Sequence, residues 1–136
     1  MQIYRTGKDT AWTTDQLNMV GAAEELQITA RRRDGTLRTP LPVWVVRVGD
    51  NLYVRSVNGR TAAWFRHAQA SGEGYVRAGG VDRDVTLVEV DTHGEEHLHD
   101  QIDAAYQAKY GRRYPTIVPS IVRPEARDAT LRLVPR

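Results

Sequence analysis

Arginines gather around a turn in the first third of the chain. Residues 31–33 are all arginine, Asp34-Gly35 is a turn dipeptide, and Arg38 follows closely. Guanidinium groups bind phosphate through paired hydrogen bonds, and free N–H groups at a strand–turn–strand corner form an anion-binding concavity. The pattern therefore predicts a cradle for a phosphate or another anion, with a cofactor as the favoured occupant. A nucleic acid is one alternative, and a solvated hairpin in which Asp34 neutralises a neighbouring arginine is the other.

Not all of these arginines can reach one ligand. Alternate residues of a strand face opposite sides, so only two or three of them converge. We select Arg31, Arg33 and Arg38 as candidate cofactor contacts, together with Thr39 and Pro40 of the segment that follows.

A second candidate lies where a strand is expected to end and a helix to begin. Ser56, Asn58 and Gly59 occupy this junction, and unpaired N–H groups at a helix start favour an anion. Ordinary turn and cap chemistry, which Asn-Gly supplies routinely, explains the residues equally well. Trp64 follows in the expected helix as a candidate wall for a cofactor ring, although an aromatic residue there is also typical of a core.

The residue types do not point to acid–base or metal chemistry. His97 and His99 are two apart in an expected helix and so face opposite sides. The sequence shows no Ser–His–Asp or Cys–His arrangement, and it contains no cysteine. We therefore name no catalytic residue and no metal ligand.

Length and composition are those of one globular domain. The chain has 136 residues, of which 40% are hydrophobic and 26% charged. We expect residues 1–12 to be loosely ordered and residues 13–136 to form a single domain. No apolar run approaches the roughly 20 residues of a membrane span, and the N-terminus lacks a signal peptide's apolar core, so we expect a cytoplasmic protein. The net charge of only +2 does not favour nucleic acid as the partner, so that alternative depends on the local cluster of arginines alone.

Hydrophobic alternation and turn dipeptides predict several short strands. The expected strands are residues 26–31, 43–48, 52–57, 74–78, 85–90 and 130–134. Short turns between the early strands imply antiparallel pairing, because parallel neighbours need long crossovers.

Three helices are expected between or before these strands. The first begins at a threonine cap at residue 13 or 14 and ends at Gly21, and the second spans residues 61–70. The third begins at Thr92, with Glu95 completing a capping box, and ends at Gly111. The proline-spaced segment after it is expected to be extended. About six antiparallel strands with two or three peripheral helices favour a mainly β (α+β) barrel over an open α/β sheet.

Residues 33–56, 63–66 and 77–85 carry a family resemblance. The first range contains Arg-Asp-Gly at 33–35, Arg-x-Pro-x-Pro-x-Trp at 38–44 and the strand residues that follow up to Ser56. The second is Ala-Trp-Phe-Arg, and the third is Arg-Ala-Gly-Gly-Val-x-Arg-Asp-Val. Over roughly residues 13–136 the chain resembles the uncharacterised bacterial family DUF2255, whose name implies no activity.

More distantly, the layout is similar to the split β-barrel flavin- and deazaflavin-binding proteins, which include the deazaflavin-dependent nitroreductases. The matching positions are Arg33 and Gly35 in the hairpin, Arg38 with Leu41-Pro42 after it, Ser56 with Asn58-Gly59 in the turn, and Trp64-Phe65 in the helix. The chain departs from the pattern at Asp34, where that group has a hydroxyl residue, and at Arg60, where it has a glycine.

This likeness implies an FMN-binding-like split β-barrel that forms a homodimer, with its cofactor in a groove at the dimer interface. It implies FMN or a deazaflavin coenzyme as cofactor, and an oxidoreductase that transfers hydride to an unknown small molecule while the protein supplies grip and orientation. Arg33 and Arg38 would hold the phosphate, Ser56 and Gly59 would donate hydrogen bonds, and Trp64 would wall the ring. The alternative, favoured by the acidic residue in the turn, is a non-enzymatic ligand-binding or interaction module on the same barrel.

Overall fold

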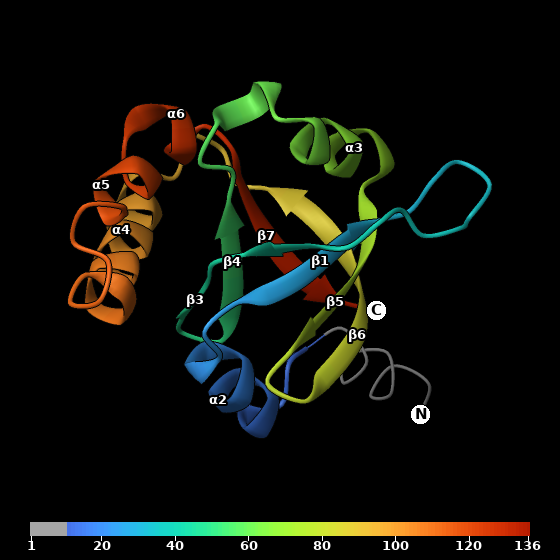
Figure 1. Cartoon of the computed structure of the whole chain (residues 1–136), viewed down its shortest axis with the longest axis horizontal. Coiled ribbons are helices and arrows are strands. Elements are labelled where there is room, and N and C mark those ends of the chain that lie inside the picture. Colours follow the sequence, from blue (N-terminus) through green and yellow to red (C-terminus); the bar gives the residue numbers. More distant parts are fainter. Residues whose placement is uncertain (1–10) are drawn as a thin grey trace.

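The computed structural model describes residues 11–136. In Figure 1 the strands curl around one core and the helices pack around the outside. The strands are β1 (Leu26–Ala30), β2 (Leu41–Val43), β3 (Val45–Val48), β4 (Asn51–Arg55), β5 (Glu73–Ala78), β6 (Val81–Glu89) and β7 (Thr130–Pro135). The helices are α2 (Thr14–Ala22), α3 (Ala63–Ser71), α4 (Glu96–Tyr110), α5 (Val118–Ile121) and α6 (Pro124–Arg127), with a short 3-10 helix η1 (Gly59–Thr61) before α3.

The seven strands form one antiparallel sheet in the order β2-β1-β5-β6-β7-β4-β3. β2 and β3 stand at opposite ends of this order, yet only Trp44 separates them along the chain. The extended segment 41–48 therefore pairs with β1 through its first half and with β4 through its second half. This double pairing closes the sheet into a barrel. The predicted mainly β, split-barrel class is confirmed, with seven strands where about six were expected.

Two hydrophobic clusters stabilise the barrel. The first fills its interior, where α2 and α3 close the ends; its members include Leu17, Leu26, Ile28, Val45, Leu52, Val54, Phe65, Val76, Val85, Leu131 and Leu133. The second lies between α4 and the outer face of β3 and β4; its members include Val46, Tyr53, Ile102, Tyr106, Tyr110 and Ile121. Val45 thus belongs to the first cluster and Val46 to the second. The start of β3 is therefore buried on both faces, which agrees with the almost wholly apolar sequence of residues 43–48.

Two element predictions are wrong. Thr92 does not cap α4, which begins at Glu96 without a side-chain cap; the Thr92 hydroxyl instead donates to the Asp128 carboxylate at 2.6 Å. The segment after α4 is not extended, since it contains α5 and α6, each with a proline in its first turn. Proline is tolerated there because the first helical N–H groups have no intrahelical acceptor.

The N-terminal end of the described chain is part of the barrel. Trp12 was expected in the loosely ordered segment, but it is buried and its indole N–H donates to the Leu133 carbonyl at 2.9 Å. Thr13 caps α2 in a capping box with Gln16, which confirms the helix start. Residues 1–10 lie outside the described part. No helix of residues 11–136 combines the length and the apolar character needed to cross a bilayer.

Candidate functional site

The arginine hairpin, residues 31–38, joins β1 to β2 and projects from the barrel (Figure 1). At its tip Gly35 has a φ of 90°, a conformation that glycine adopts without steric cost. The Asp34 carboxylate accepts hydrogen bonds from the Thr36 hydroxyl at 2.7 Å and the Thr36 N–H at 3.0 Å, and these bonds lower the pKa of Asp34. Asp34 therefore holds the turn together.

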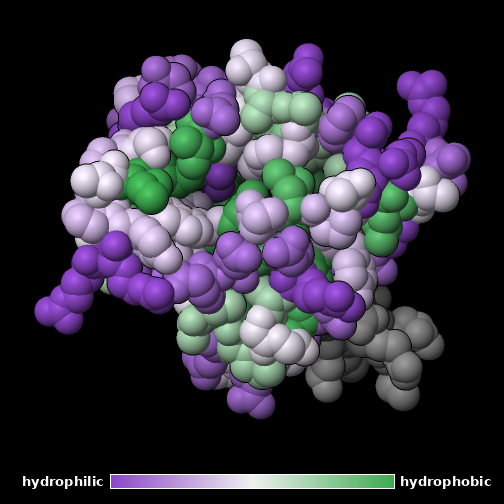
Figure 2. All heavy atoms as spheres, in the orientation of Figure 1, coloured by the Kyte–Doolittle hydropathy of each residue, from purple (hydrophilic) through white to green (hydrophobic). Residues whose placement is uncertain are grey.

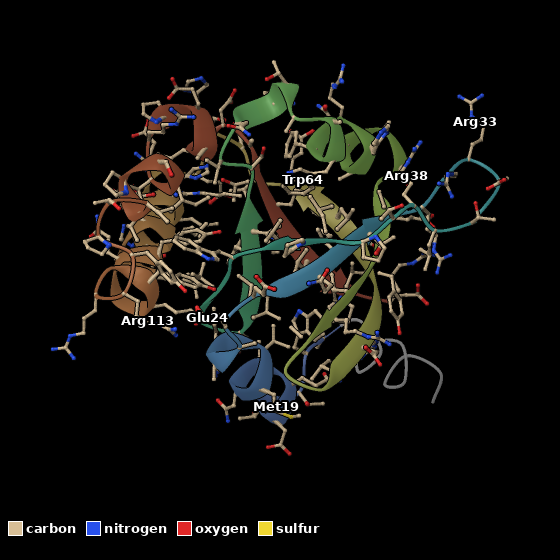
Figure 3. The ribbon with its side chains drawn as sticks, in the orientation of Figure 1. Met19, Glu24, Arg33, Arg38, Trp64 and Arg113 are labelled. Carbon is tan, nitrogen blue, oxygen red and sulfur yellow. The ribbon has the colours of Figure 1, made fainter. Side chains whose placement is uncertain are left out.

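Two of the hairpin arginines are engaged within the protein. Arg31 pairs with Asp84 of β6 at 2.5 Å. Arg32 donates to the carbonyl of Leu37 at 2.8 Å, across the hairpin. Arg33 is exposed at the outer end of the hairpin and points away from the barrel (Figure 3), without a hydrogen bond or ion pair to the described chain.

Arg38 differs from the other three. It lies at the base of the hairpin on the side of α3 (Figure 3) and is half-buried. Its Nε is buried without a hydrogen-bond partner, and its guanidinium makes no ion pair with any residue from 11 to 136. An unmade hydrogen bond of a buried group costs about 1–3 kcal/mol, and more for a charged one. An anionic ligand would relieve this cost.

Three adjoining pockets form a groove along the hairpin, β2 and α3. The basic pocket, of about 400 Å³, is lined by the hairpin arginines and His67. The central pocket, of about 260 Å³, includes Arg38, Thr39, Trp64 and His67. The apolar pocket, of about 380 Å³, lies beyond Trp64. Arg38 and His67 line both the basic and the central pockets, and Leu41 and Trp64 line both the central and the apolar pockets. The three pockets are therefore neighbours.

The apolar pocket has a polar group at its wall. Ser56 follows β4 and is 1% exposed, and its hydroxyl has no hydrogen-bond partner. Trp44 forms another wall and stacks on Tyr110 of α4, with ring centroids 4.0 Å apart and planes 4° from parallel. Arg38 Nε and Ser56 Oγ are the only two buried side-chain nitrogen or oxygen atoms without a partner in the described part of the chain. Both lie at the groove.

A buried arginine supports the floor of the apolar pocket. Arg55, the last residue of β4, is 2% exposed. Its guanidinium donates to the carboxylate of Asp103 at 2.5 Å, the hydroxyl of Thr130 at 3.0 Å and the carbonyl of Ile121 at 3.1 Å. It also lies 3.1 Å from Nδ1 of His99. These bonds tie the end of β4 to α4, α5 and β7.

The Arg55 contact fixes the protonation of His99. Arginine only donates, so His99 Nδ1 accepts, and His99 Nε2, 3.0 Å from the Asp91 carbonyl, carries the proton. His99 is therefore neutral. Burial lowers the pKa of His99 below its ordinary value of 6.5, and the positive charges of Arg55 and Arg127 lower it further.

We expect this neutral histidine to make folding pH-dependent. Because its pKa is lower in the folded than in the unfolded protein, the unfolded state binds more protons as the pH falls below about 6.5, and the free energy of unfolding decreases. Urea unfolding between pH 7 and pH 5 measures the effect. His99→Gln should give a flatter profile over this range, whereas His97→Gln, at an exposed position of the same helix, should follow the unmodified protein. Parallel profiles for all three would contradict the prediction.

The structure brings most of the sequence-predicted site residues to the groove. Arg38, Thr39 and Trp64 line the central pocket, Arg31 and Arg33 the basic pocket, and Ser56 and Asn58 the apolar pocket. Pro40 instead lines a hollow on the other side of the hairpin, with Tyr75 and Arg77. Gly59 lines none of these pockets; its φ of 75° is a left-handed conformation that favours glycine, so the turn itself accounts for this residue.

Sequence reasoning missed two residues of the groove. His67 lies one helical turn after Trp64 on α3, and this spacing is enough to place both on one face. Arg55 has no comparable pattern, since its partners are 44 to 75 residues away along the chain.

The chain is similar to one known family and to several solved structures. The model of a family described as "Uncharacterized protein conserved in bacteria (DUF2255)" matches residues 16–133. No curated protein matches. A conserved hypothetical protein of Mycobacterium tuberculosis is similar in structure, with a TM-score of 0.59 and 13% identity, over 94% of this chain and 83% of that one.

Two further solved structures are similar. An FAD-binding protein of Mesorhizobium loti has a TM-score of 0.52 and 16% identity, over 93% of this chain and 91% of that one. An FAD- and haem-binding protein of Mycobacterium smegmatis has a TM-score of 0.52 and 15% identity, over 93% of this chain and 67% of that one. At these identities the similarity establishes a shared fold.

Proposed function

The chain belongs to the bacterial DUF2255 family, and we propose that it binds a flavin-type cofactor in the groove and acts as an oxidoreductase on a small molecule. The unpartnered, half-buried Arg38 guanidinium carries this proposal. It is a permanent cation that no described residue neutralises, placed beside an aromatic wall. The shared fold with two FAD-binding proteins supports it.

The residues of the groove suit a phosphorylated, ring-containing cofactor. Arg38 would form a charge-assisted pair with the phosphate. Arg33, at the hairpin tip, is the other predicted phosphate contact that has no ion pair within the described chain. Trp64 would lie against the ring and exclude water from one face. FMN, FAD and a deazaflavin coenzyme all have this chemistry, and any of them, when bound, supplies hydride or electron transfer. The chain's own residues bind and orient it.

Two further expectations remain predictions. A homodimer whose interface covers the groove is expected from the likeness to split barrels. A cytoplasmic location is expected from the sequence and also stays a prediction.

Titration of the purified full-length protein tests cofactor binding. We expect FMN, FAD or the deazaflavin coenzyme to bind with a micromolar or lower dissociation constant, observed as a change in visible absorption. Riboflavin, which has the ring but no phosphate, is the matched control and should bind much more weakly, because it leaves Arg38 unpaired. Equal affinity for riboflavin and FMN, or no binding of any phosphorylated cofactor, would contradict the proposal. Binding without any faster oxidation or reduction of the cofactor would favour the non-enzymatic module.

A further inference from the structure

The apolar pocket differs from its two neighbours in the character of its walls. It lies between β2, the segment after β4, and α5, and its walls include Leu41, Val43, Trp44, Trp64, Ile117 and Ile121. Figure 2 shows hydrophobic side chains around a hollow near the centre of this face, with hydrophilic ones toward the hairpin. Its volume of about 380 Å³ lies within the range of small-molecule sites, about 300–1,000 Å³.

The pocket keeps hydrophobic side chains in contact with water. Val57 and Ile117 are 38% and 47% exposed, and they are two of only four large hydrophobic residues exposed in the described part of the chain. Both line this pocket. A site that leaves apolar surface and two indole rings open favours an apolar, planar occupant, because covering that surface removes it from water.

The polar groups of the pocket are few. The Ser56 hydroxyl is buried and unpartnered at the wall of the pocket, so one hydrogen bond from an occupant would satisfy it once the side chain turns toward the pocket. Asn58, exposed near the rim, adds an amide. The ring of a flavin presents several donors and acceptors along one edge, which these two side chains are too few to satisfy. A molecule with a single hydrogen-bonding oxygen fits better.

The pocket also has no free positive charge. Arg55 lines it, but the side chain of Arg55 is fully buried, and its guanidinium is already paired with Asp103 and bonded to neutral acceptors. The charged residue at the rim is Glu25, which repels anions. The central pocket, with the unpaired Arg38, therefore favours an anion, and the apolar pocket favours an uncharged molecule.

We propose that the apolar pocket binds an uncharged aromatic molecule carrying one hydrogen-bonding oxygen, which reaches Ser56. The apolar pocket adjoins the central pocket, which includes Arg38, at Leu41 and Trp64. That this molecule is the substrate of the redox reaction rests on the proposed function. The binding itself requires no cofactor. Ser56 and Asn58, assigned to the cofactor by the sequence, then contact the second molecule.

Three tryptophans make the site observable by NMR. The chain has tryptophan only at positions 12, 44 and 64, so a ¹⁵N-labelled sample gives three indole N–H signals. Trp44 and Trp64 line the pocket, whereas Trp12 is buried with its indole bonded to Leu133 and serves as the internal reference. The probe is 2-naphthol, and 2-naphthoate is its matched anion. Trp44→Phe and Trp64→Phe assign the signals.

We expect 2-naphthol to shift the Trp44 and Trp64 signals but not that of Trp12, and 2-naphthoate to bind more weakly. Ser56→Ala should weaken 2-naphthol binding about three- to ten-fold, the range of one hydrogen bond, without unfolding the protein, since the hydroxyl has no partner to lose. Ile117→Glu at the pocket should also weaken it. Met19→Glu, which changes an equally exposed hydrophobic residue on α2, should not.

The outcomes separate this inference from the proposed function. Unshifted Trp44 and Trp64 signals, or full affinity for 2-naphthol in Ser56→Ala, would contradict the proposed binding of an aromatic molecule in the apolar pocket. Displacement of 2-naphthol by FMN or FAD would also contradict this inference. It would mean that the cofactor ring occupies the apolar pocket, and the proposed function would remain intact. Binding of 2-naphthol to a protein that binds no cofactor would leave the pocket intact and remove the proposed function.

Discussion

Replacing Arg55 by methionine is expected to destabilise the protein by about 3–5 kcal/mol, the cost of breaking a buried ion pair by removing one partner. The side chain of Arg55 is fully buried and that of Asp103 is 22% exposed. Removal of the guanidinium also leaves the Thr130 hydroxyl and the Ile121 carbonyl without this donor. Urea unfolding, followed by circular dichroism, measures the loss.

The exposed pair of Arg77 and Asp82 provides the matched control. Its bond length is 2.8 Å, but the two side chains are 68% and 45% exposed. Arg77→Met should therefore cost less than about 1 kcal/mol, as solvent-exposed pairs do. Equal losses for Arg55→Met and Arg77→Met would show that the buried network contributes no special stability.

A double variant separates the ion pair from the packing of the arginine stem. Arg55→Met/Asp103→Leu removes both charges of this pair, and Arg127, which lies 3.8 Å from Asp103, keeps its ion pair with Asp100 at 2.9 Å. We expect it to be more stable than Arg55→Met alone, because replacement of a buried pair by apolar residues is often neutral or stabilising. It also supplies a folded protein for comparison if Arg55→Met does not fold.

The strands were predictable because their information is local. In β1 the pattern at Leu26 and Ile28 reflects one buried face, and the apolar run after Trp44 reflects two. Barrel closure was harder to infer, because the segment pairs with β1 before Trp44 and with β4 after it. Local patterns do not show which strands a segment will meet.

The errors have the same origin. The Thr92 capping box was plausible from spacing, but Asp128, distant in sequence, binds the Thr92 hydroxyl instead. The hairpin arginines look equivalent in the sequence, yet Asp84 in β6 neutralises Arg31 and leaves Arg38 free. The local turn located the basic cluster, and only the tertiary partners show which of its members can bind a ligand.

Arg38→Ala is expected to weaken binding of a phosphorylated flavin about 10- to 100-fold. One hydrogen bond to a charged group contributes about 1.5–3 kcal/mol, and 1.4 kcal/mol corresponds to a factor of ten. The variant should remain folded, because the guanidinium of Arg38 has no partner within residues 11–136 to lose. Absorption titration with FMN and FAD measures the affinity.

The riboflavin comparison decides whether Arg38 acts through the phosphate. In Arg38→Ala the affinity for riboflavin should stay unchanged, since this ligand has no phosphate for the guanidinium to bind. Arg112→Ala, which removes an equally charged but exposed side chain after α4, should bind FMN as the unmodified protein does. A parallel loss of FMN and riboflavin in Arg38→Ala would mean that Arg38 shapes the pocket rather than pairing with an anion. A loss confined to FMN would make Arg38 the anion-binding residue of the groove, because only the phosphate distinguishes the two ligands.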